Sequence, residues 1–545
     1  MVLMEKYGPP KEMWPEFKLD LPEAKNWPAK LNITEMLIDK NIFRGMGEKT
    51  AILHEDQRIT FNQLRSMVDS FGSALKFLGV EPQDRVIIRL PNTPEFVVSH
   101  LAVQKIGAVS VPAFPLYKAG EIEYIANNCE AKIVITAHDS AGEVVETRGR
   151  LQTVKHIILV GDDAKNDKCN LKFSRLIQEF SDSRLNATRM DLDDVSLLLY
   201  TSGTTGLPKG CIHTQRDYLA IGECYFKRVL LLNENDVCGG PASLAFAFGH
   251  GMLLSLYFGG AISLYGNRKF EPTHMFGLIE KHGITVLFAV PSAYKAMLTR
   301  RSEGDRHKFS CLRTCISAGE HLSPSLYTEI RQFFGCEVLN GIGTTELLHI
   351  FISARFGSVK PGSLGTPVPY YDVRIVNDEG VELPPSKVGY LAVKGPVGAR
   401  YWRRNDEQAK YVKYGFNYTG DLAYKDEDGF FWFMGRDDDL IKTAGYRVSP
   451  QEVEDILSRH PAVFEAAVIG KPDPERGQIV KAFVVLKPGV NPCSALYNEL
   501  ISFVRSYLAP YKTPREIEFA DSLPKTLTGK VKRKELLSKE NQKGM

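Results

Sequence analysis

The chain has 545 residues, of which 43% are hydrophobic and 24% are charged, and its formal net charge is +3. This length accommodates about two or three domains with large cores, and the composition excludes a disordered or fibrous protein. A charge so close to zero gives no support for a nucleic-acid partner.

The N-terminus and the apolar runs argue against secretion and membrane insertion. The first residues, MVLMEKYGPPKEMWPEF, carry acids, lysines and prolines where a signal peptide needs an apolar core. The longest apolar stretch, from Met252 to Tyr265, is too short for a membrane span and contains two glycines. We therefore expect a soluble, cytoplasmic protein with no membrane span. The sequence leaves open whether it forms a homodimer.

The nine cysteines are an odd number in a long chain, as is usual for reduced thiols. Cys311 and Cys315 have a spacing that is found in metal sites, but no second pair and no histidine cluster accompanies them. We therefore interpret both as buried thiols.

The first half of the chain alternates apolar runs with helical patterns. Helices are predicted from Pro94 and from Ala119, and strands at 86–90, 108–114, 131–137 and 156–160. Further buried strands are predicted at 195–199, 259–265 and 284–291. Strands that alternate with helices favour α/β layers with parallel sheets.

The pattern changes after Gly362. Alternating apolar residues and Asp/Gly turns predict antiparallel strands, including a hairpin that turns at Asp428 and Gly429. An acidic run, Asp437 to Asp439, has the composition of a linker. The chain then predicts a compact α+β unit, whose helices and strands fall at 450–460, 463–470, 479–487, 496–508 and 515–520.

The sequence YTSGTTGLPKG, residues 200–210, follows the strand predicted at 195–199 and contains three glycines. A Walker loop needs a lysine directly after its last glycine, whereas Leu207 follows Gly206 here. The sequence GIGTTE from Gly341 fails the dinucleotide-binding pattern, because Glu346 stands where the third glycine belongs. Backbone amides, hydroxyl donors and Lys209 suit an anion, although such a loop is also found as an ordinary turn.

Three further motifs accompany this loop, at 341–351, 418–442 and 524–536. In their order and spacing the four motifs resemble those of the adenylate-forming superfamily, which contains acyl-CoA synthetases, luciferases and peptide-synthetase adenylation domains. The resemblance extends from about Ala51 to Leu536. The stretches 338–351 and 435–454 are most similar to the benzoate and 2-aminobenzoate CoA ligases. Ile342 stands where the superfamily usually has an aromatic residue that stacks on adenine, a departure that this branch shares.

The resemblance implies an AMP-forming acid–CoA ligase that uses ATP, Mg2+ and coenzyme A. In the family, Thr201 to Lys209 hold the β- and γ-phosphates, Thr345 donates to the α-phosphate and Glu346 binds Mg2+. Asp421 accepts the ribose hydroxyls, and Arg436 adds a ribose contact. The predicted ATP-binding residues are therefore Thr201, Ser202, Gly203, Thr204, Thr205, Gly206, Lys209, Gly319, Glu320, Thr345, Asp421, Arg436 and Lys530.

The family also implies a moving small domain. Lys530 enters the active site from this domain and, with Thr345 and Glu346, completes the predicted catalytic set. Asp438 matches the hinge, and the rotation brings Gly445 to the pantetheine tunnel of CoA, with Arg447 nearby for phosphate. We therefore expect an α/β fold with a large N-terminal domain, 1–437, that ends in a β-rich subdomain. A small mobile α+β C-terminal domain, 438–545, follows it. By composition alone, Lys530 is one lysine of a charged tail and the aspartates are a solvated run.

The acid pocket is predicted at Ala247, Phe248 and His349, because they match positions that face the aromatic ring in the aryl branch. Phe248 and His349 suit a flat ring of benzoate or 2-aminobenzoate type, while a short- or medium-chain aliphatic acid stays open. Transfer of the acyl group to a separate carrier protein also stays open, as does a nucleotide-binding regulator without catalysis. All expected catalytic positions are filled, which favours the ligase.

Overall fold

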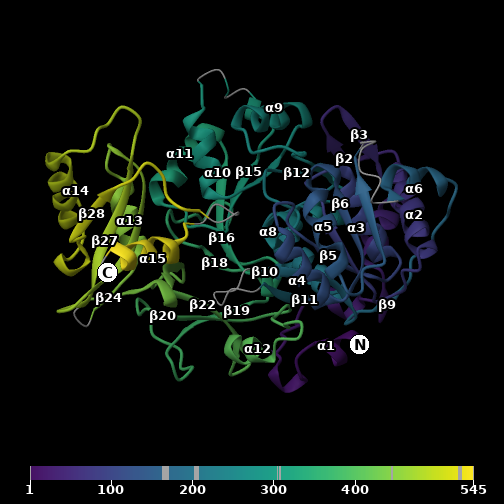
Figure 1. Cartoon of the computed structure of the whole chain (residues 1–545), viewed down its shortest axis with the longest axis horizontal. Coiled ribbons are helices and arrows are strands. Elements are labelled where there is room, and N and C mark those ends of the chain that lie inside the picture. Colours follow the sequence, from purple (N-terminus) through teal and green to yellow (C-terminus); the bar gives the residue numbers. More distant parts are fainter. Residues whose placement is uncertain are drawn as a thin grey trace.

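The computed structural model describes residues 2–161, 171–201, 208–302, 305, 308–443, 446–525 and 531–543. It has an α/β large domain, built on three sheets, and an α+β small domain at one end of the molecule (Figure 1). No helix of these described stretches is both long and apolar enough to cross a membrane.

The first sheet has seven strands in the order β11-β10-β5-β4-β6-β7-β8, all parallel except for the antiparallel pair β10–β11. The predicted alternation of strands and helices is confirmed here. The strands are β4 (Arg85–Arg89), β5 (Val109–Pro112), β6 (Ala131–Ala137), β7 (His156–Val160), β8 (Leu171–Lys172), β10 (Val195–Thr201) and β11 (Lys209–Thr214). The helices of this part are α2 (Phe61–Phe77), α3 (Pro94–Lys105), α4 (Ala119–Cys129), α5 (Ala141–Thr147), α6 (Phe173–Glu179) and α7 (Gln215–Ile221).

The second sheet has nine strands in the order β18-β17-β16-β15-β14-β12-β13-β2-β3, with a parallel centre and antiparallel edges. Its strands are β2 (Thr50–His54), β3 (Gln57–Thr60), β12 (Val237–Gly239), β13 (Ala261–Ser263), β14 (Val286–Ala289), β15 (Thr314–Ser317), β16 (Glu337–Gly343), β17 (Ile350–Ser353) and β18 (Thr366–Pro367). The accompanying helices are α8 (Ala247–His250), α9 (Pro272–His282), α10 (Pro291–Thr299) and α11 (Pro324–Phe334).

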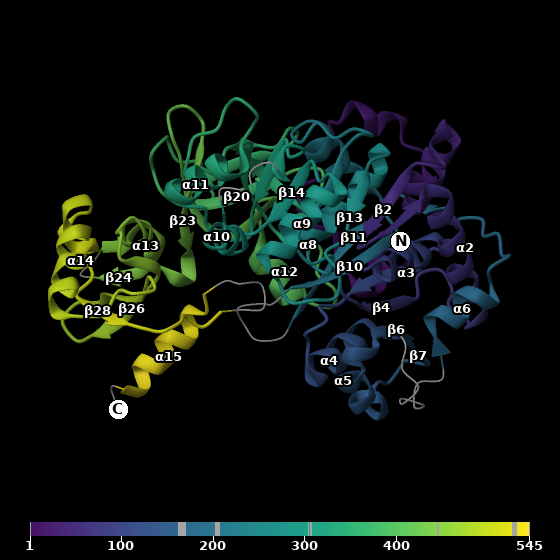
Figure 2. The same ribbon diagram turned by 90° about the horizontal axis from the view of Figure 1, so that it is seen from above.

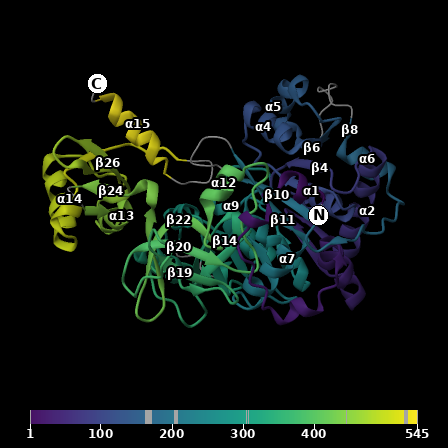
Figure 3. The ribbon, with the colours of Figure 1, turned by 90° about the horizontal axis from the view of Figure 1, so that it is seen from below.

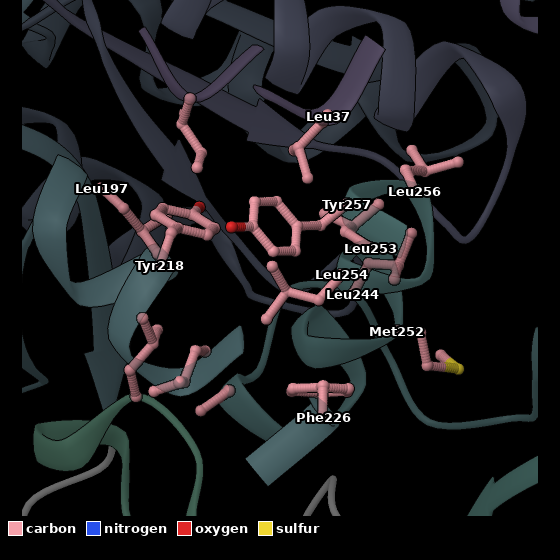
Figure 4. Close-up of a cluster of buried hydrophobic side chains, with 14 of the residues drawn as sticks. Leu37, Leu197, Tyr218, Phe226, Leu244, Met252, Leu253, Leu254, Leu256 and Tyr257 are labelled. Atoms are coloured by element: carbon pink, nitrogen blue, oxygen red, sulfur yellow. The ribbon is translucent and has the colours of Figure 1, made fainter. Parts of the chain in front are cut away.

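Local sequence sets several of these boundaries. Thr60 begins α2 with a capping box, in which its side chain accepts from the Gln63 amide and the Gln63 side chain accepts from the Thr60 amide. Every residue of β4 is buried, as expected for a strand covered on both faces. Leu197 and Tyr218 of the first layer meet Leu37, Phe226 and neighbouring leucines in one continuous core (Figure 4).

The third sheet is antiparallel and contains the predicted hairpin. Its strands are β19 (Asp372–Val376), β20 (Gly389–Lys394), β21 (Val412–Lys413), β22 (Phe416–Lys425) and β23 (Phe431–Arg436). The β22–β23 turn contains Gly429 with a φ of 85°, a conformation that suits glycine. Helix α12 (Asn405–Tyr411) precedes β21.

The small domain has its own hydrophobic core and lies beside the β23 end of the large domain (Figure 2). It contains β24 (Ile441–Thr443), β25 (Tyr446–Val448), β26 (Val463–Asp473), β27 (Gly477–Leu486) and β28 (Glu516–Phe519). Helices α13 (Pro450–Ser458) and α14 (Ser494–Tyr507) pack with this sheet, and α15 (Arg533–Lys543) forms the yellow C-terminal end (Figure 3). The α+β unit predicted after residue 450 is confirmed.

The short N-terminal elements lie on the large domain. Tyr7 of α1 (Val2–Tyr7) stacks on Trp402 with ring centroids 4.3 Å apart. A small sheet pairs β1 (Lys30–Leu31) with β9 (Met190–Asp191). The prediction of two buried thiols is correct for Cys315, whereas Cys311 is only half-buried. No group of three or more metal-binding side chains occurs in the described part of the chain.

Candidate active site

The predicted phosphate loop connects two paired strands. Thr201 ends β10, Lys209 begins β11, and the two residues lie opposite each other in the antiparallel ladder. The other predicted loop residues, Ser202, Gly203, Thr204, Thr205 and Gly206, lie outside the described residues. The loop lysine is therefore carried by a strand of the first sheet.

Lys209 is linked to Glu346 through an aromatic residue from a distant segment. Its side chain forms an ion pair with Glu407 of α12, and its Nζ lies 5.6 Å from the ring centroid of Tyr401. The Tyr401 hydroxyl donates to Glu346 Oε1 at 2.5 Å. The loop lysine and the predicted metal-binding carboxylate, which come from different sheets, are thus brought to one place.

The segment 400–402 reaches this place because it pairs with β11. Ile212 donates its amide to the Arg400 carbonyl, and Trp402 donates its amide to the Gly210 carbonyl, both at 2.8 Å. Trp402 is fully buried and anchors the segment. Tyr401, between them, is held beneath Lys209.

Thr345 and Glu346 lie in a short 3₁₀ turn, Thr345–Leu347, just after β16. Thr344 caps this turn by accepting the Leu347 amide at 3.3 Å. Burial and then the nearby Glu346 carboxylate raise the pKa of the Tyr401 hydroxyl well above its usual range. Tyr401 therefore stays protonated and donates to Glu346.

Glu346 fits a Mg2+ site that the nucleotide completes. A carboxylate oxygen is a hard ligand, and Mg2+ usually takes one or two carboxylates together with substrate phosphates. The residue present thus suits the ion that the family uses.

Asp421 and Arg436 face each other on β22 and β23. Arg436 Nη1 donates to Asp421 Oδ1 at 3.1 Å and to the Thr419 carbonyl at 3.0 Å. Burial lowers the pKa of the Arg436 guanidinium, but the Asp421 carboxylate outweighs this effect and the pKa is raised. The pair predicted to contact the ribose is thus preformed in the structure.

Gly319 and Glu320 follow β15. Gly319 has a φ of 87°, which favours glycine. Glu320 accepts two hydrogen bonds at 2.8 Å from Ser292, one from its amide and one from its hydroxyl. Glu320 thus stabilises the start of α10 through hydrogen bonds. Its contact with adenine stays a prediction.

His321, the next residue, meets the small domain. Its Nε2 lies 2.9 Å from Asp455 Oδ2 of α13, and its ring faces Phe433 at 6.5 Å between centroids. Burial lowers the pKa of the His321 imidazole, and the Arg533 charge lowers it further. The carboxylates of Asp455 and Glu454 outweigh both effects, so the net result is a raised pKa. The family motifs did not predict this interdomain contact.

Phe248 and His349 of the predicted acid pocket lie together, with ring centroids 6.2 Å apart. The ring centroids of Tyr225 and Phe226 lie 5.0 and 4.9 Å from the His349 ring centroid. Ala247 begins α8 beside Phe248 and is buried. Burial lowers the pKa of His349 to about 3, so the imidazole is neutral at physiological pH. These groups form an apolar, ring-lined environment around a neutral imidazole.

The predicted residues of the small domain are only partly described. Asp438 lies in the 3₁₀ turn Asp437–Asp439 between β23 and β24, and Arg447 lies in β25 opposite Lys442. Gly445 and Lys530 lie outside the described residues. Arg533, three residues after Lys530, forms ion pairs with Glu454 at 2.7 Å and with Asp439 at 3.6 Å.

Two family models match the chain. The model of the AMP-binding enzymes matches residues 40–402, and the model of their C-terminal domain matches residues 452–530. The chain belongs to the AMP-binding enzyme family. The prediction of an adenylate-forming fold with a large and a small domain is confirmed.

Relatives of this AMP-binding enzyme include a benzoate–CoA ligase of Thauera aromatica, 34% identical over 95% of this chain and 98% of that protein. An acetyl-coenzyme A synthetase of Bacillus subtilis is also 34% identical, over 93% of this chain and 90% of that protein. Among solved structures, the anthranilate CoA ligase AuaEII in complex with anthranoyl-AMP superposes with a TM-score of 0.90. It is 34% identical, over 96% of this chain and 99% of that one. A benzoate CoA ligase from Burkholderia xenovorans has a TM-score of 0.83 at 33% identity, covering 93% and 100%.

Several residues of the candidate site carry no signal in the sequence. Tyr401 and Glu407 have no local motif; Tyr401 reaches Lys209 through the pairing of segment 400–402 with β11, and Glu407 reaches it from α12. Tyr225 and Phe226 lie in the short helical segment Gly222–Lys227, where the sequence does not distinguish them from ordinary core residues. Only the three-dimensional arrangement reveals their positions.

Proposed function

We propose that this protein is an ATP-dependent, AMP-forming acid–CoA ligase for an aromatic acid of the benzoate or 2-aminobenzoate type. The observation that carries the aromatic assignment is the group of rings around His349, because flat apolar side chains suit contact with a planar ring. The benzoate and anthranilate ligases among its relatives support the same substrate class.

In the first half-reaction, a carboxylate oxygen of the acid attacks the α-phosphorus of ATP. The new O–P bond forms as the bond to the β-phosphate breaks, which gives an acyl-adenylate and pyrophosphate. Negative charge accumulates on the phosphates, so preorganised cations and donors matter more than an acid or a base. Lys209 and Thr201 would hold the β- and γ-phosphates, and Thr345 would donate to the α-phosphate. Mg2+, when held by Glu346, would neutralise part of this charge.

Asp421 would accept the ribose hydroxyls, because a carboxylate can accept two donors at once. Its partner Arg436 supports this role, since it fixes the orientation of the carboxylate at 3.1 Å. Gly319 and Glu320 would flank the adenine.

In the second half-reaction, the sulfur of coenzyme A attacks the acyl carbon. A C–S bond forms, the bond from that carbon to the AMP oxygen breaks, and the thiol proton leaves to solvent. Gly445 and Arg447 would guide the pantetheine and phosphate of CoA after the small domain, 438–545, turns about Asp438. The order of the family motifs supports this assignment.

Pyrophosphate release with a panel of acids, with and without CoA, tests the proposed reaction. Pyrophosphate should be released from ATP when benzoate or 2-aminobenzoate is supplied, and addition of CoA should convert the acyl-adenylate to thioester and AMP. Turnover on acetate or butyrate that exceeds turnover on both aromatic acids would exclude the aromatic assignment. Adenylate that CoA does not consume would favour transfer to a carrier protein instead.

Lys530→Ala tests the catalytic lysine. The substitution removes a positive charge from the transition state of the first step, so adenylate formation should fall by about a hundredfold or more. Thioester formation from synthetic acyl-adenylate should be largely retained. Lys532→Ala is the matched control, since Lys532 is an exposed lysine of the same segment that pairs with Glu535. Equal loss of both half-reactions in Lys530→Ala would contradict the assignment.

A further inference from the structure

Glu407 is a buried carboxylate at the centre of a group of cations. Its side chain is only 6% exposed and forms an ion pair with Lys209. Its Oε1 also lies 3.0 Å from Lys410 Nζ and 3.3 Å from Arg404 Nη2. One carboxylate thus contacts three cations, and one of these is the lysine of the predicted phosphate loop.

This pairing restricts what Lys209 can do when the nucleotide is absent. The Lys209 side chain is 13% exposed, so its ammonium lies in a partly desolvated position between Glu407 and the Tyr401 ring. An unpaired charge in such a position is costly, and a phosphate oxygen and a carboxylate are alternative partners for it. Contact with a triphosphate therefore requires Lys209 to give up part of its interaction with Glu407.

Glu407 can compete with phosphate oxygens for Lys209 only while its carboxyl group is ionised. Burial raises the pKa of Glu407, but the ion pairs with Lys209 and Lys410 outweigh burial and lower the pKa below its usual value. The carboxylate is therefore ionised at neutral pH. Asp406, the preceding residue, is 59% exposed and pairs with Arg404, which Glu407 also contacts.

We propose that Glu407 is a positioning residue that holds Lys209 in the nucleotide-free enzyme and competes with ATP and pyrophosphate for it. This inference rests on the proposed role of Lys209 in binding phosphate. When pyrophosphate leaves, Glu407 recaptures the ammonium, so no bare charge remains in the site. Glu407 thereby weakens the binding of pyrophosphate and promotes its release.

Glu407→Gln tests this role, because it removes the charge and keeps the shape. Calorimetric titration of the full-length protein with inorganic pyrophosphate should show binding about tenfold tighter than in the wild type, since one competing ion pair is lost. KM for ATP should fall, while kcat should fall or stay constant as pyrophosphate release slows. Binding that is unchanged or weaker would overturn the proposal.

Two further variants, a control and a substitute, accompany this test. Asp406→Asn makes the same change of charge one residue away, at a carboxylate that does not contact Lys209, and should leave pyrophosphate binding within about twofold. Tightening in Asp406→Asn equal to that in Glu407→Gln would contradict a specific role. Glu407→Asp keeps the charge but shortens the side chain, so it should tighten binding by a smaller factor and serves if Glu407→Gln does not fold.

A double-mutant cycle with Lys209→Ala separates the role of Glu407 from the phosphate-binding role of Lys209. If Lys209→Ala leaves pyrophosphate binding unchanged, the proposed phosphate site fails, and the role of Glu407 fails with it. If Lys209→Ala weakens binding but Glu407→Gln does not tighten it, only the role of Glu407 fails. In the Lys209→Ala background, Glu407→Gln should change binding by less than about twofold. A persistent tenfold effect would assign the competition to Arg404 and Lys410 instead.

Discussion

Gly251 is the residue at which one added methyl group would disturb the ring-lined environment of His349. A Cβ at Gly251 would lie 2.3 Å from His349 Nε2 and 2.9 Å from Phe226 Cζ. Carbon atoms in contact prefer separations of about 3.5–4.0 Å, so the imidazole must move by about 1 Å. The rings of Tyr225 and Phe226 already contact His349 at 5.0 and 4.9 Å, which leaves it little room.

Gly251→Ala should therefore impair the acid site selectively. Overpacking of this kind costs about 1–3 kcal/mol. In the proposed acid site, displacement of His349 would misplace the carboxylate of the substrate, so kcat/KM for benzoate or 2-aminobenzoate should fall about ten- to a hundredfold. KM for ATP should change by less than about twofold, because the methyl group displaces His349 and not the phosphate-binding residues. Steady-state pyrophosphate release, with each substrate varied in turn, measures both values.

Gly277→Ala is the matched control. Gly277 lies within α9, and a Cβ there would meet no atom within 4 Å. Alanine replaces glycine favourably inside a helix, by about 0.5–1 kcal/mol, so stability should rise slightly and both KM values should stay constant. If Gly251→Ala leaves the kinetics for the acid unchanged, or if KM for ATP rises in parallel, the placement of the acid beside His349 is refuted.

Two further predictions concern hydrogen-bonded pairs of the site. Tyr401→Phe removes the 2.5 Å hydrogen bond to Glu346. Because hydrogen bonds to charged groups contribute about 1.5–3 kcal/mol, the Mg2+ concentration for half-maximal pyrophosphate exchange should rise about tenfold or more, and an unchanged value would contradict the role of Tyr401. The His321–Asp455 contact should be fully present below about pH 6.5, the ordinary value for histidine, and should be lost as the pH rises through the raised pKa of folded His321. X-ray scattering in solution should then show a looser domain arrangement at pH 9 than at pH 6, whereas Asp455→Asn should show the looser arrangement at both.

The layered architecture could be predicted because local patterns determine it. Runs such as 131–137 and 156–160 contain three or more consecutive apolar residues, which fits strands buried on both faces, and they form β6 and β7 side by side in parallel. The turn at Gly429 follows equally from local chemistry. Such elements depend on neighbours in sequence, so the chain itself discloses them.

The candidate site could be predicted only where a residue belongs to a long motif. Lys209, Glu346 and Asp421 were found in this way, and their roles stay predictions. Tyr401 and Glu407 are distant in sequence from Lys209; Tyr401 contacts it through the pairing of 400–402 with β11, and Glu407 contacts it from α12. No periodicity near Tyr401 distinguishes it from any other tyrosine, so its position follows from tertiary packing.

The partners of the site cations suggest how such a site combines binding with release. Lys209 forms an ion pair with Glu407, and Arg436 forms an ion pair with Asp421. A largely buried cation such as Lys209 would be costly without a partner, so the nucleotide-free site keeps it paired. The incoming triphosphate then exchanges one ion pair for another, and the net gain in binding is smaller than the charges alone would give. In the proposed mechanism pyrophosphate leaves before the small domain turns to the thioester step, and moderate affinity for the triphosphate would favour that release.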